Sequence, residues 1–469
     1  MKNYNLRSTD EHLNNLTSWL PNQTVSERLA NTGFNIKYFE KLPSVINHCL
    51  PLLSALLERY DSRERCFIFN GIKCGFFLED VYYCTGLPVD GVEVTGVVKS
   101  NNDAKEEICR MYLGVSGLLT KGKISLKNLR DRFINAEDTD YYTRAYLLYV
   151  IGSFIVPDKT GRSVDVMFLE QLKDIDKIGT FAWGAALLAH LHVELETASE
   201  SSLAGHSYSL MIWAFLHIPK LLKLLPNTGR KGPDEFPLLV QWTNWLSLDL
   251  KNNFHKNLKS KFSDILDNLK DEDIVWQPYK NLQNLPNDHP QHRENFLCRT
   301  VLICYNEVVY HRPDLCPKQY GIDKPEYSGV RKEIAIYKKQ RKLSGEIDWS
   351  KYTSEKGKVD YSKYIQEWKH RSESLLKEAL GVEEHSGPTL SSTPSSIGNV
   401  RYDCSNTHFE DDEPEVEPLQ PPPSEDATPR TQADASPKTP DDGHGSGGEE
   451  ITWNTLYLAF SGQAHHSTG

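Results

Sequence analysis

Apolar residues recur at three- and four-residue intervals through much of the first 220 positions, which is typical of helices that bury one face. Two stretches, residues 144–155 and 181–195, are apolar almost all round and are expected to be fully buried helices. Ser44 and Ser125 precede apolar runs and predict helix caps, while Pro51 is expected to kink or restart the first helix. The helices predicted in this way cover residues 44–60, 108–119, 126–133, 144–155, 164–175, 181–195 and 210–218.

The block CFIFNGIKCGFFLEDVYYCTGLPVDGVEVTG, residues 66–96, follows a different pattern. Asn70 and Gly71 separate two apolar runs, and both residue types accept positive φ at low cost. The pair therefore predicts a type I′ β-hairpin. A helix of one or two turns is expected over residues 78–85, ended by Gly86 in the left-handed conformation. By itself the pattern predicts a structural hairpin–helix unit that closes a core.

Charge is concentrated near the C-terminus. Residues 383–450 contain 16 acidic and three basic residues, whereas the remainder of the chain contains 48 acidic and 50 basic residues. The net charge of −11 therefore belongs to this segment. A segment so rich in Pro, Ser, Thr, Gly and acidic residues buries too little apolar area to offset its ordering entropy, and it is expected to be disordered. The near-neutral remainder argues neither for nor against a nucleic-acid surface.

Together the patterns predict a mainly α protein, with a compact helical domain, a small β-hairpin and a disordered acidic tail. The expected divisions are a polar N-terminal segment over 1–24, a domain over 25–375, a Pro/Ser/Thr-rich tail over 376–450 and a short apolar segment over 451–469. The last segment is expected to be either a short partner-binding stretch or, as we favour, the product of an imprecise gene model.

Secretion and membrane insertion are not expected. The N-terminus carries no apolar run of the signal-peptide kind, and the longest apolar run, residues 145–156, is too short to span a bilayer. Nine cysteines, mostly within apolar runs, suit reduced thiols in the cytosol or nucleus. No membrane partner is therefore expected.

Motifs along residues 25–375 resemble, in order and spacing, those of the plant mobile domain family, also called the aminotransferase-like plant mobile domain. The family has a Thr-Leu-x-Asp-Val helix start, a Gly-Leu-Pro-Val-x-Gly exit, an Arg-Ala-Tyr-Leu-Leu run, a Trp-Gly helix and a late Pro-Asp segment. The matching residues are Asp80, Gly86, Leu87, Pro88, Gly91, Arg144, Asp174, Trp183, Gly184, Trp213, Pro313, Asp314, Gln319 and Gly321.

Several positions depart from the family pattern. Phe77 replaces the threonine that begins the helix motif. In the late segment, Lys318 replaces an arginine, Tyr320 a phenylalanine, and Leu315-Cys316 a basic and apolar pair. A threonine at position 77 would form an N-cap together with Asp80. We therefore expect this chain to have lost the cap.

The resemblance implies a non-catalytic nuclear protein that supports transposable-element silencing, genome stability and meristem maintenance through protein–protein contacts. The implied partners are other plant mobile domain proteins or phosphatase-like nuclear proteins, with DNA or chromatin contacted indirectly. Two alternatives stay open. One is a transposon-encoded accessory protein that contacts DNA, and the other is an undetected hydrolase or phosphatase-like enzyme.

Motifs typical of enzymes are absent from the sequence. A pyridoxal enzyme needs a Schiff-base lysine on an α/β scaffold, and the phosphatase metal motifs and the phosphate-binding Gly-x-x-x-x-Gly-Lys loop do not occur. Asp80 and Asp90 are the carboxylates to consider first for the hydrolase alternative, although a helix-start role and a turn role account for them. We expect no enzyme, no cofactor and no metal site.

Clusters of cysteine and histidine also point to structural roles. Cysteines spaced by eight and ten residues do not fit a zinc ribbon and are expected to be buried thiols. Histidines two apart on a helix face different directions, and a second pair in a Pro-rich loop lacks a cysteine partner. The residues concerned are Cys66, Cys74, Cys84, His190, His192, His289 and His292.

Two further sets of residues suggest regulation. A basic cluster predicts a nuclear import signal or nucleic-acid contact, with a solvated helix face as the alternative; it comprises Lys338, Lys339, Arg341 and Lys342. Four hydroxyl residues of the tail precede proline and match the pattern of proline-directed phosphorylation, with a plain spacer as the alternative. They are Thr393, Thr428, Ser436 and Thr439.

Overall fold

The computed structural model describes residues 3–6, 8–9, 16–30, 32, 34, 37–41, 48–98, 102–137, 139–158, 162–225, 236–242, 257–322, 347–348 and 362–376. All of them belong to one unit, residues 1–390. The expected disorder of the tail and the role of segment 451–469 concern residues outside the described ones, as does the Ser44 cap.

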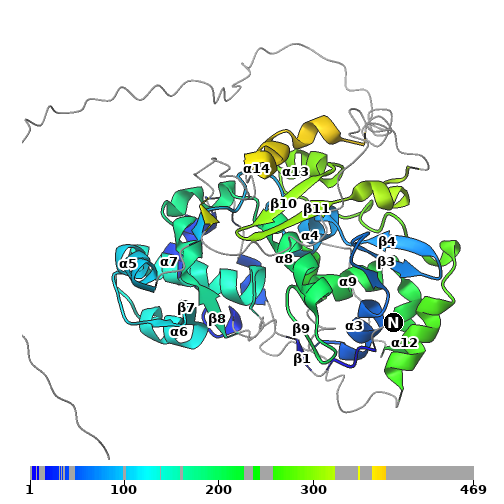
Figure 1. Ribbon diagram of the computed structural model, residues 1–469, viewed down its shortest axis with the longest axis horizontal. Coiled ribbons are helices and arrows are strands. Elements are labelled where there is room, and N and C mark those ends of the chain that lie inside the picture. The colour runs from blue at the N-terminus through cyan, green and yellow to red at the C-terminus, as the bar shows by residue number, and fades with distance from the viewer. Residues whose placement is uncertain are drawn as a thin grey trace, which may run out of the picture. The chain divides into compact units, whose positions relative to one another are not determined.

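Helices make up most of the described unit, as the sequence predicts (Figure 1). The α-helices are α2 Gln23–Ala30, α3 Leu50–Leu57, α4 Leu78–Thr85, α5 Asn102–Leu113, α6 Leu126–Phe133, α7 Thr139–Val150, α8 Trp183–Thr197, α9 Ser207–His217, α10 Leu238–Gln241, α12 Leu258–Asp267, α13 His289–Phe296 and α14 Ser362–Lys369.

Shorter helical segments connect them. The 3₁₀-helices are η1 Lys37–Lys41, η3 Val166–Glu170, η4 Ile175–Thr180, η5 Pro219–Leu224, η6 Asp271–Asp273, η7 Pro313–Leu315, η8 Pro317–Tyr320 and η9 Arg371–Ser374. One π-helix, η2 Ile151–Ile155, continues α7. No helix of the described residues is both long and apolar enough to cross a membrane.

Local sequence explains several helix ends. The Ser125 hydroxyl accepts a hydrogen bond from the Asn128 amide at 3.4 Å, which confirms the predicted cap of α6. Pro51 stands in the first turn of α3, where its missing N–H costs nothing, so it restarts a helix rather than kinking one. Gly86 ends α4 with φ of 70°, as predicted.

Within the described residues, five small sheets accompany the helices, not the single hairpin that we expected. Their strands are β1 Ser8–Thr9, β2 Tyr60–Asp61, β3 Cys66–Phe69, β4 Ile72–Gly75, β5 Val97–Val98, β6 Leu119–Thr120, β7 Lys123–Ser125, β8 Ser163–Asp165, β9 Ser202–Leu203, β10 Thr300–Cys304, β11 Glu307–His311 and β12 Ile347–Asp348. The pairings are β2-β3-β4, β6-β7-β8, β10-β11, β5-β12, all antiparallel, and the parallel pair β1-β9.

The hairpin predicted at Asn70 and Gly71 is confirmed, with φ of 47° and 81° at the two turn residues. The helix predicted over residues 164–175 is wrong. Ser163–Asp165 pairs with β7 instead, and the chain then forms η3, where the Asp165 carboxylate accepts a hydrogen bond from the Met167 amide. The helix predicted over residues 108–119 lies earlier, as α5.

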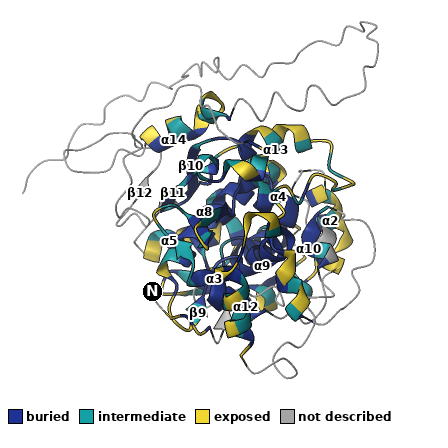
Figure 2. Ribbon diagram, turned by 90° about the vertical axis from the view of Figure 1, so that its right-hand side faces the viewer, coloured by how far each residue is buried: buried dark blue, intermediate teal, exposed yellow. Residues whose placement is uncertain are grey.

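Helix α8 lies at the centre of the unit, and each of its residues from Trp183 to Leu195 is buried (Figure 2). It packs against α4, against the β10–β11 hairpin and against η2. Exposed residues are concentrated on outer helices such as α12, α13 and α14 (Figure 2). The predicted burial is therefore confirmed for residues 182–195, whereas Phe181 is half-buried and precedes the helix.

Candidate functional site

Asp80 is a buried carboxylate at the start of α4, with a relative exposure of 1%. One oxygen accepts a hydrogen bond from the Phe77 amide at 2.7 Å, and the other accepts from the Tyr279 hydroxyl at 2.6 Å. His217 Nε2 lies 3.4 Å from that second oxygen. Burial, followed by the Asp80 charge, holds the pKa of Tyr279 well above its ordinary value, so the phenol stays protonated and donates.

This network confirms that Asp80 complements the helix start. The Phe77 side chain makes no cap hydrogen bond, as expected, but the carboxylate half of the cap survives without the family's threonine. The Phe77 ring instead packs in a small cluster with Cys66 and Cys316, and edge-on to His311. At position 77 this chain therefore lacks the hydroxyl that would cap the helix, and has an aromatic ring that packs against neighbouring side chains instead.

The C-terminal part of residues 66–96 is hydrogen-bonded to the start of α8. The Gly184 amide donates to the Pro88 carbonyl at 2.7 Å, and a Cβ on Gly184 would lie 3.1 Å from that same oxygen. Gly91, with φ of 116°, lies so close to η4 that a Cβ would fall 2.2 Å from the Thr180 carbonyl oxygen. Both glycines are thus required by close backbone contact.

Residues 311–319 form hydrogen bonds to the end of the β3–β4 hairpin and to the start of α4. Gln319 donates from Nε2 to the Gly75 carbonyl at 3.0 Å and accepts from the Gly75 amide at 2.7 Å. His311 donates from Nδ1 to the Cys298 carbonyl, which leaves Nε2 to accept from the Leu78 amide at 3.3 Å. Burial lowers the pKa of His311 to about 4, in keeping with this neutral ring.

Other family-motif residues also make internal contacts. Trp183 is buried and donates to the Ile178 carbonyl at 2.9 Å, and Trp213 is buried against Phe67. The remaining members hold loops: Arg144 donates to the Leu172 carbonyl, Asp174 pairs with Lys177, Asp314 pairs with Arg312 beside Pro313, Leu87 is buried, and Gly321 ends η8 with φ of 71°.

The two carboxylates of the hydrolase alternative have different partners. Asp80 is held as described above, whereas Asp90 pairs with Arg371 just after α14. Burial works to raise the pKa of Asp90, but the Arg371 charge and hydrogen bond outweigh it and bring the pKa below its ordinary value. Asp90 thus connects residues 66–96 to the last described segment through Arg371. The sequence predicted only that Asp90 stabilises a turn.

Among the described residues, the predicted cysteine and histidine roles are structural. The eight described cysteines are buried thiols. Burial raises the pKa values of Cys74 and Cys84 well above the usual range. His192 contacts the Tyr60 hydroxyl, His289 contacts the Tyr83 hydroxyl and His292 contacts Asp288.

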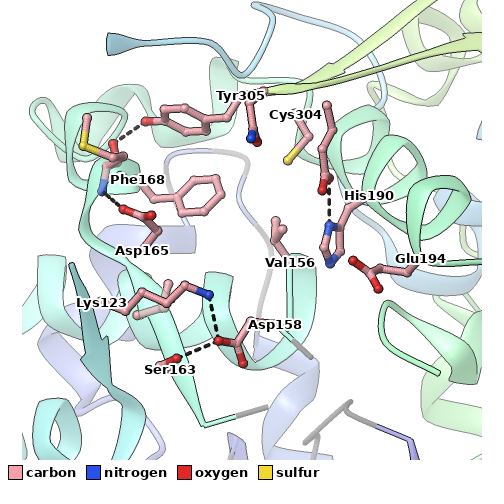
Figure 3. A pocket seen from close by; sticks show the side chains of 14 residues that line it. Lys123, Val156, Asp158, Ser163, Asp165, Phe168, His190, Glu194, Cys304 and Tyr305 are labelled. Carbon is pink, nitrogen blue, oxygen red and sulfur yellow. Dashed lines mark hydrogen bonds and ion pairs between the residues drawn. The ribbon is translucent and has the colours of Figure 1, made fainter. Parts of the chain in front are cut away.

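A cavity of about 420 Å³ opens beside α8 (Figure 3). Its lining includes Val156, Met167 and Phe168 on the apolar side, and the ion pair of Lys123 with Asp158 at 2.9 Å. None of its fourteen lining residues belongs to the family-motif set. They are Lys123, Val156, Asp158, Ser163, Val164, Asp165, Met167, Phe168, His190, Glu194, Cys304, Tyr305, Asn306 and Glu307.

Three buried titratable side chains, His190, Glu194 and Glu307, converge on one wall of this cavity. The spacing of His190 and His192 argues against a shared ligand role, because residues two apart on a helix face different directions. The useful signal was the spacing of His190 and Glu194, four residues apart on one helix face. Glu307 comes from a distant strand, so no local pattern could have added it.

The basic cluster Lys338, Lys339, Arg341 and Lys342 lies outside the described residues, as do Thr393, Thr428, Ser436 and Thr439. Lys318, which replaces the family arginine, pairs with Asp271 at 2.7 Å and lies over the Trp276 ring. A basic side chain at this position therefore retains an acidic partner.

Comparison with known proteins identifies the domain. The family model described as plant mobile domain matches residues 42–375. Protein MAIN-LIKE 2 of Arabidopsis thaliana is 31% identical over 399 residues, which is 80% of this chain and 55% of that protein. Protein MAINTENANCE OF MERISTEMS of the same species is 30% identical over 58% of this chain and 57% of its own length.

A third relative, the Arabidopsis thaliana serine/threonine-protein phosphatase 7 long form homolog, is 32% identical over 64% of this chain but only 23% of its own length. The chain thus spans little more than half of the first two relatives and a smaller part of the third. No solved structure matches the chain.

Proposed function

Because the chain belongs to the plant mobile domain family, we propose that it is a non-catalytic nuclear interaction protein. It acts in transposable-element silencing, genome stability and meristem maintenance by binding other proteins. Its partners are plant mobile domain proteins or phosphatase-like nuclear proteins, and its contact with chromatin is indirect. The relative named MAINTENANCE OF MERISTEMS supports the meristem role.

One structural observation favours an interaction role over catalysis. The described family-motif residues hold segments of the fold together, and none of them lines the cavity. Catalytic groups normally converge on a concave site. Because the motif residues cap helices and pack in the core instead, their role is to maintain the structure of the domain. The outer surface of that scaffold is then the part available for partners.

The proposal is tested by purifying the tagged full chain from nuclei of plant cells, with and without nuclease digestion. We expect nuclear accumulation and nuclease-resistant recovery of proteins that carry a plant mobile domain or a phosphatase-like domain. Recovery that disappears on nuclease digestion, with steeply salt-dependent binding of the pure protein to duplex DNA, would favour the DNA-binding alternative.

Localisation has a matched control. Replacing Lys338, Lys339, Arg341 and Lys342 by alanine is expected to keep the protein out of the nucleus. The control replaces four exposed lysines of the described part, which should leave nuclear import unchanged: Lys127, Lys173, Lys280 and Lys369. Equal nuclear levels of the two variants would exclude this cluster as the import signal. Deleting residues 66–96 is not a usable test, because the block packs into the core.

A further inference from the structure

We propose that His190, Glu194 and Glu307 bind a divalent transition-metal ion, Zn²⁺ in the first instance, with an open coordination position facing the cavity. This site goes beyond the proposed interaction role and does not depend on it. It uses none of the family-motif residues, and Gly184, which bonds the Pro88 carbonyl, is not part of it.

The backbone places the three side chains for one ion. His190 and Glu194 are one helical turn apart on α8, so both point to the same side. Glu307 begins β11, and the β10–β11 hairpin packs on α8. Figure 3 shows the His190 and Glu194 side chains pointing toward one another at the cavity wall.

The distances are close to those of a coordination site. One ligand atom from each residue lies within 4.8 Å of the other two, and His190 Nδ1 is 2.8 Å from a Glu307 oxygen. Nitrogen and oxygen ligands bind Zn²⁺ at about 2.1 Å, so in a tetrahedral site two of them lie about 3.4 Å apart. Side-chain movements of about 1 Å therefore close the site around an ion.

The hydrogen bonds of His190 favour metal binding by fixing its tautomer. Nε2 lies 3.0 Å from the Pro157 carbonyl oxygen. A carbonyl only accepts, so Nε2 carries a proton and Nδ1 faces the glutamates. Metal-bound histidines donate their distal N–H to a carbonyl or carboxylate in the same way.

Electrostatics requires a positive charge at this point. His190, Glu194 and Glu307 have relative exposures of 5%, 3% and 3%. Two buried carboxylates facing an imidazole lone pair would be costly without a cation between them. Either a proton on Nδ1 or a metal ion supplies it. Burial works to lower the pKa of His190, but Glu307, then Glu194 and the Pro157 carbonyl, bring it above the ordinary value.

A divalent ion held between His190, Glu194 and Glu307 would place positive charge next to both carboxylates. The lysine on the cavity wall, Lys123, is paired with Asp158.

The donor atoms and the cavity select the class of ion. One imidazole with two carboxylates suits Zn²⁺ or Mn²⁺, whereas Mg²⁺ and Ca²⁺ prefer oxygen ligands alone. Three protein ligands leave a fourth position, and the cavity of about 420 Å³ gives room there for water or a small anionic ligand.

The test uses the purified full chain after chelator treatment, titrated calorimetrically with Zn²⁺, Mn²⁺ and Mg²⁺. We expect one equivalent of Zn²⁺ to bind, with weaker Mn²⁺ and little Mg²⁺ binding, and Zn²⁺ to raise the melting temperature. Glu194→Gln and Glu307→Gln should each weaken Zn²⁺ affinity at least about tenfold. Glu196→Gln, two residues along the same helix and outside the cluster, is the matched control.

A proton-only cluster gives a different result. In that case Zn²⁺ does not raise the melting temperature of the wild type, and the two glutamine variants show no Zn²⁺-dependent difference from it. If the folded wild type binds no Zn²⁺, or if all three variants bind it like the wild type, the site does not exist. X-ray absorption showing sulfur ligands would equally overturn the assignment.

Discussion

At the scale of single residues, Asp80 shows how one side chain can serve both a helix and the core. It is predictable as a helix-start acid because its position within the block is local information. Its other two neighbours, Tyr279 and His217, lie 199 and 137 residues away along the chain. No periodicity or motif spacing relates such distant positions, so only the structure reveals that the carboxylate is buried and shared.

Removing the Asp80 carboxylate should strongly destabilise the fold. Asp80→Ala leaves the Phe77 amide and the Tyr279 hydroxyl without their acceptor, and we expect a loss of about 3 kcal/mol in the free energy of unfolding. Asp80→Asn keeps one acceptor oxygen and should cost about half as much. Urea denaturation of the purified chain measures both. Asp103→Asn, an exposed acid in the first turn of α5, is the control and should change stability by less than about 0.5 kcal/mol. Equal losses at both positions would contradict the network.

At the scale of elements, the hairpin and α4 are coupled through Gly75 and Phe77. A Cβ on Gly75 would lie 1.9 Å from the Phe77 ring, so the ring occupies the space that glycine leaves. The family's threonine at position 77 would leave that space unfilled.

This packing predicts that the effect of Gly75→Ala on stability depends on whether residue 77 is Phe or Thr. Gly75→Ala alone should destabilise by about 2 kcal/mol through the clash. Phe77→Thr should cost about 2 kcal/mol, because the regained cap of about 1 kcal/mol is smaller than the lost ring burial. In the Phe77→Thr background, Gly75→Ala should cost little or stabilise. A double-mutant cycle by denaturant unfolding measures the coupling, and additive losses would show that the two positions do not interact.

Elements whose sequence contains a strong local motif could be predicted, whereas elements determined by pairing with distant strands could not. Asn70-Gly71 is a strong turn signal, but the second hairpin turns at Tyr305 and Asn306, with Tyr305 at φ of 51°. Tyrosine is not expected at positive φ, so that hairpin was missed. Apolar spacing over 164–175 suggested a helix, but pairing with β7 through Val164 and Ile124 determined the structure instead.

At the scale of the whole described unit, the Asp90–Arg371 pair joins the block to the last described segment. Arg371 also lies over the Trp368 ring, and the Trp368 indole donates to the Gly91 carbonyl at 3.0 Å. The chain therefore closes on itself across 281 residues. Trp368 and Gly91 are 277 residues apart along the chain, so no local pattern could indicate this contact.

This closure predicts a pH dependence. The folded pKa of Asp90 is below its ordinary value of 3.8, so the pair stabilises the fold above that pH and the contribution is lost as the pH falls through the folded pKa. Asp90→Asn should cost about 1–2 kcal/mol at pH 7, since the pair is only partly buried. The gap between wild type and variant should narrow below pH 4. Denaturant unfolding from pH 7 to pH 3 measures it, and a constant gap would contradict the ion pair. Asp174→Asn, in the exposed pair with Lys177, should show little change at any pH.

The π-helix η2 has a consequence for how this chain can vary in length. A π turn holds one residue more than an α turn, and the bond from the Val156 amide to the Ile151 carbonyl at 2.8 Å closes it. Loss of one residue within 151–155 would therefore restore α-helical winding and leave the rotation of the residues beyond it almost unchanged. The Pro157 carbonyl would still face His190. In homologues that keep His190, Glu194 and Glu307, a length difference between α7 and Pro157 should therefore be a single-residue deletion.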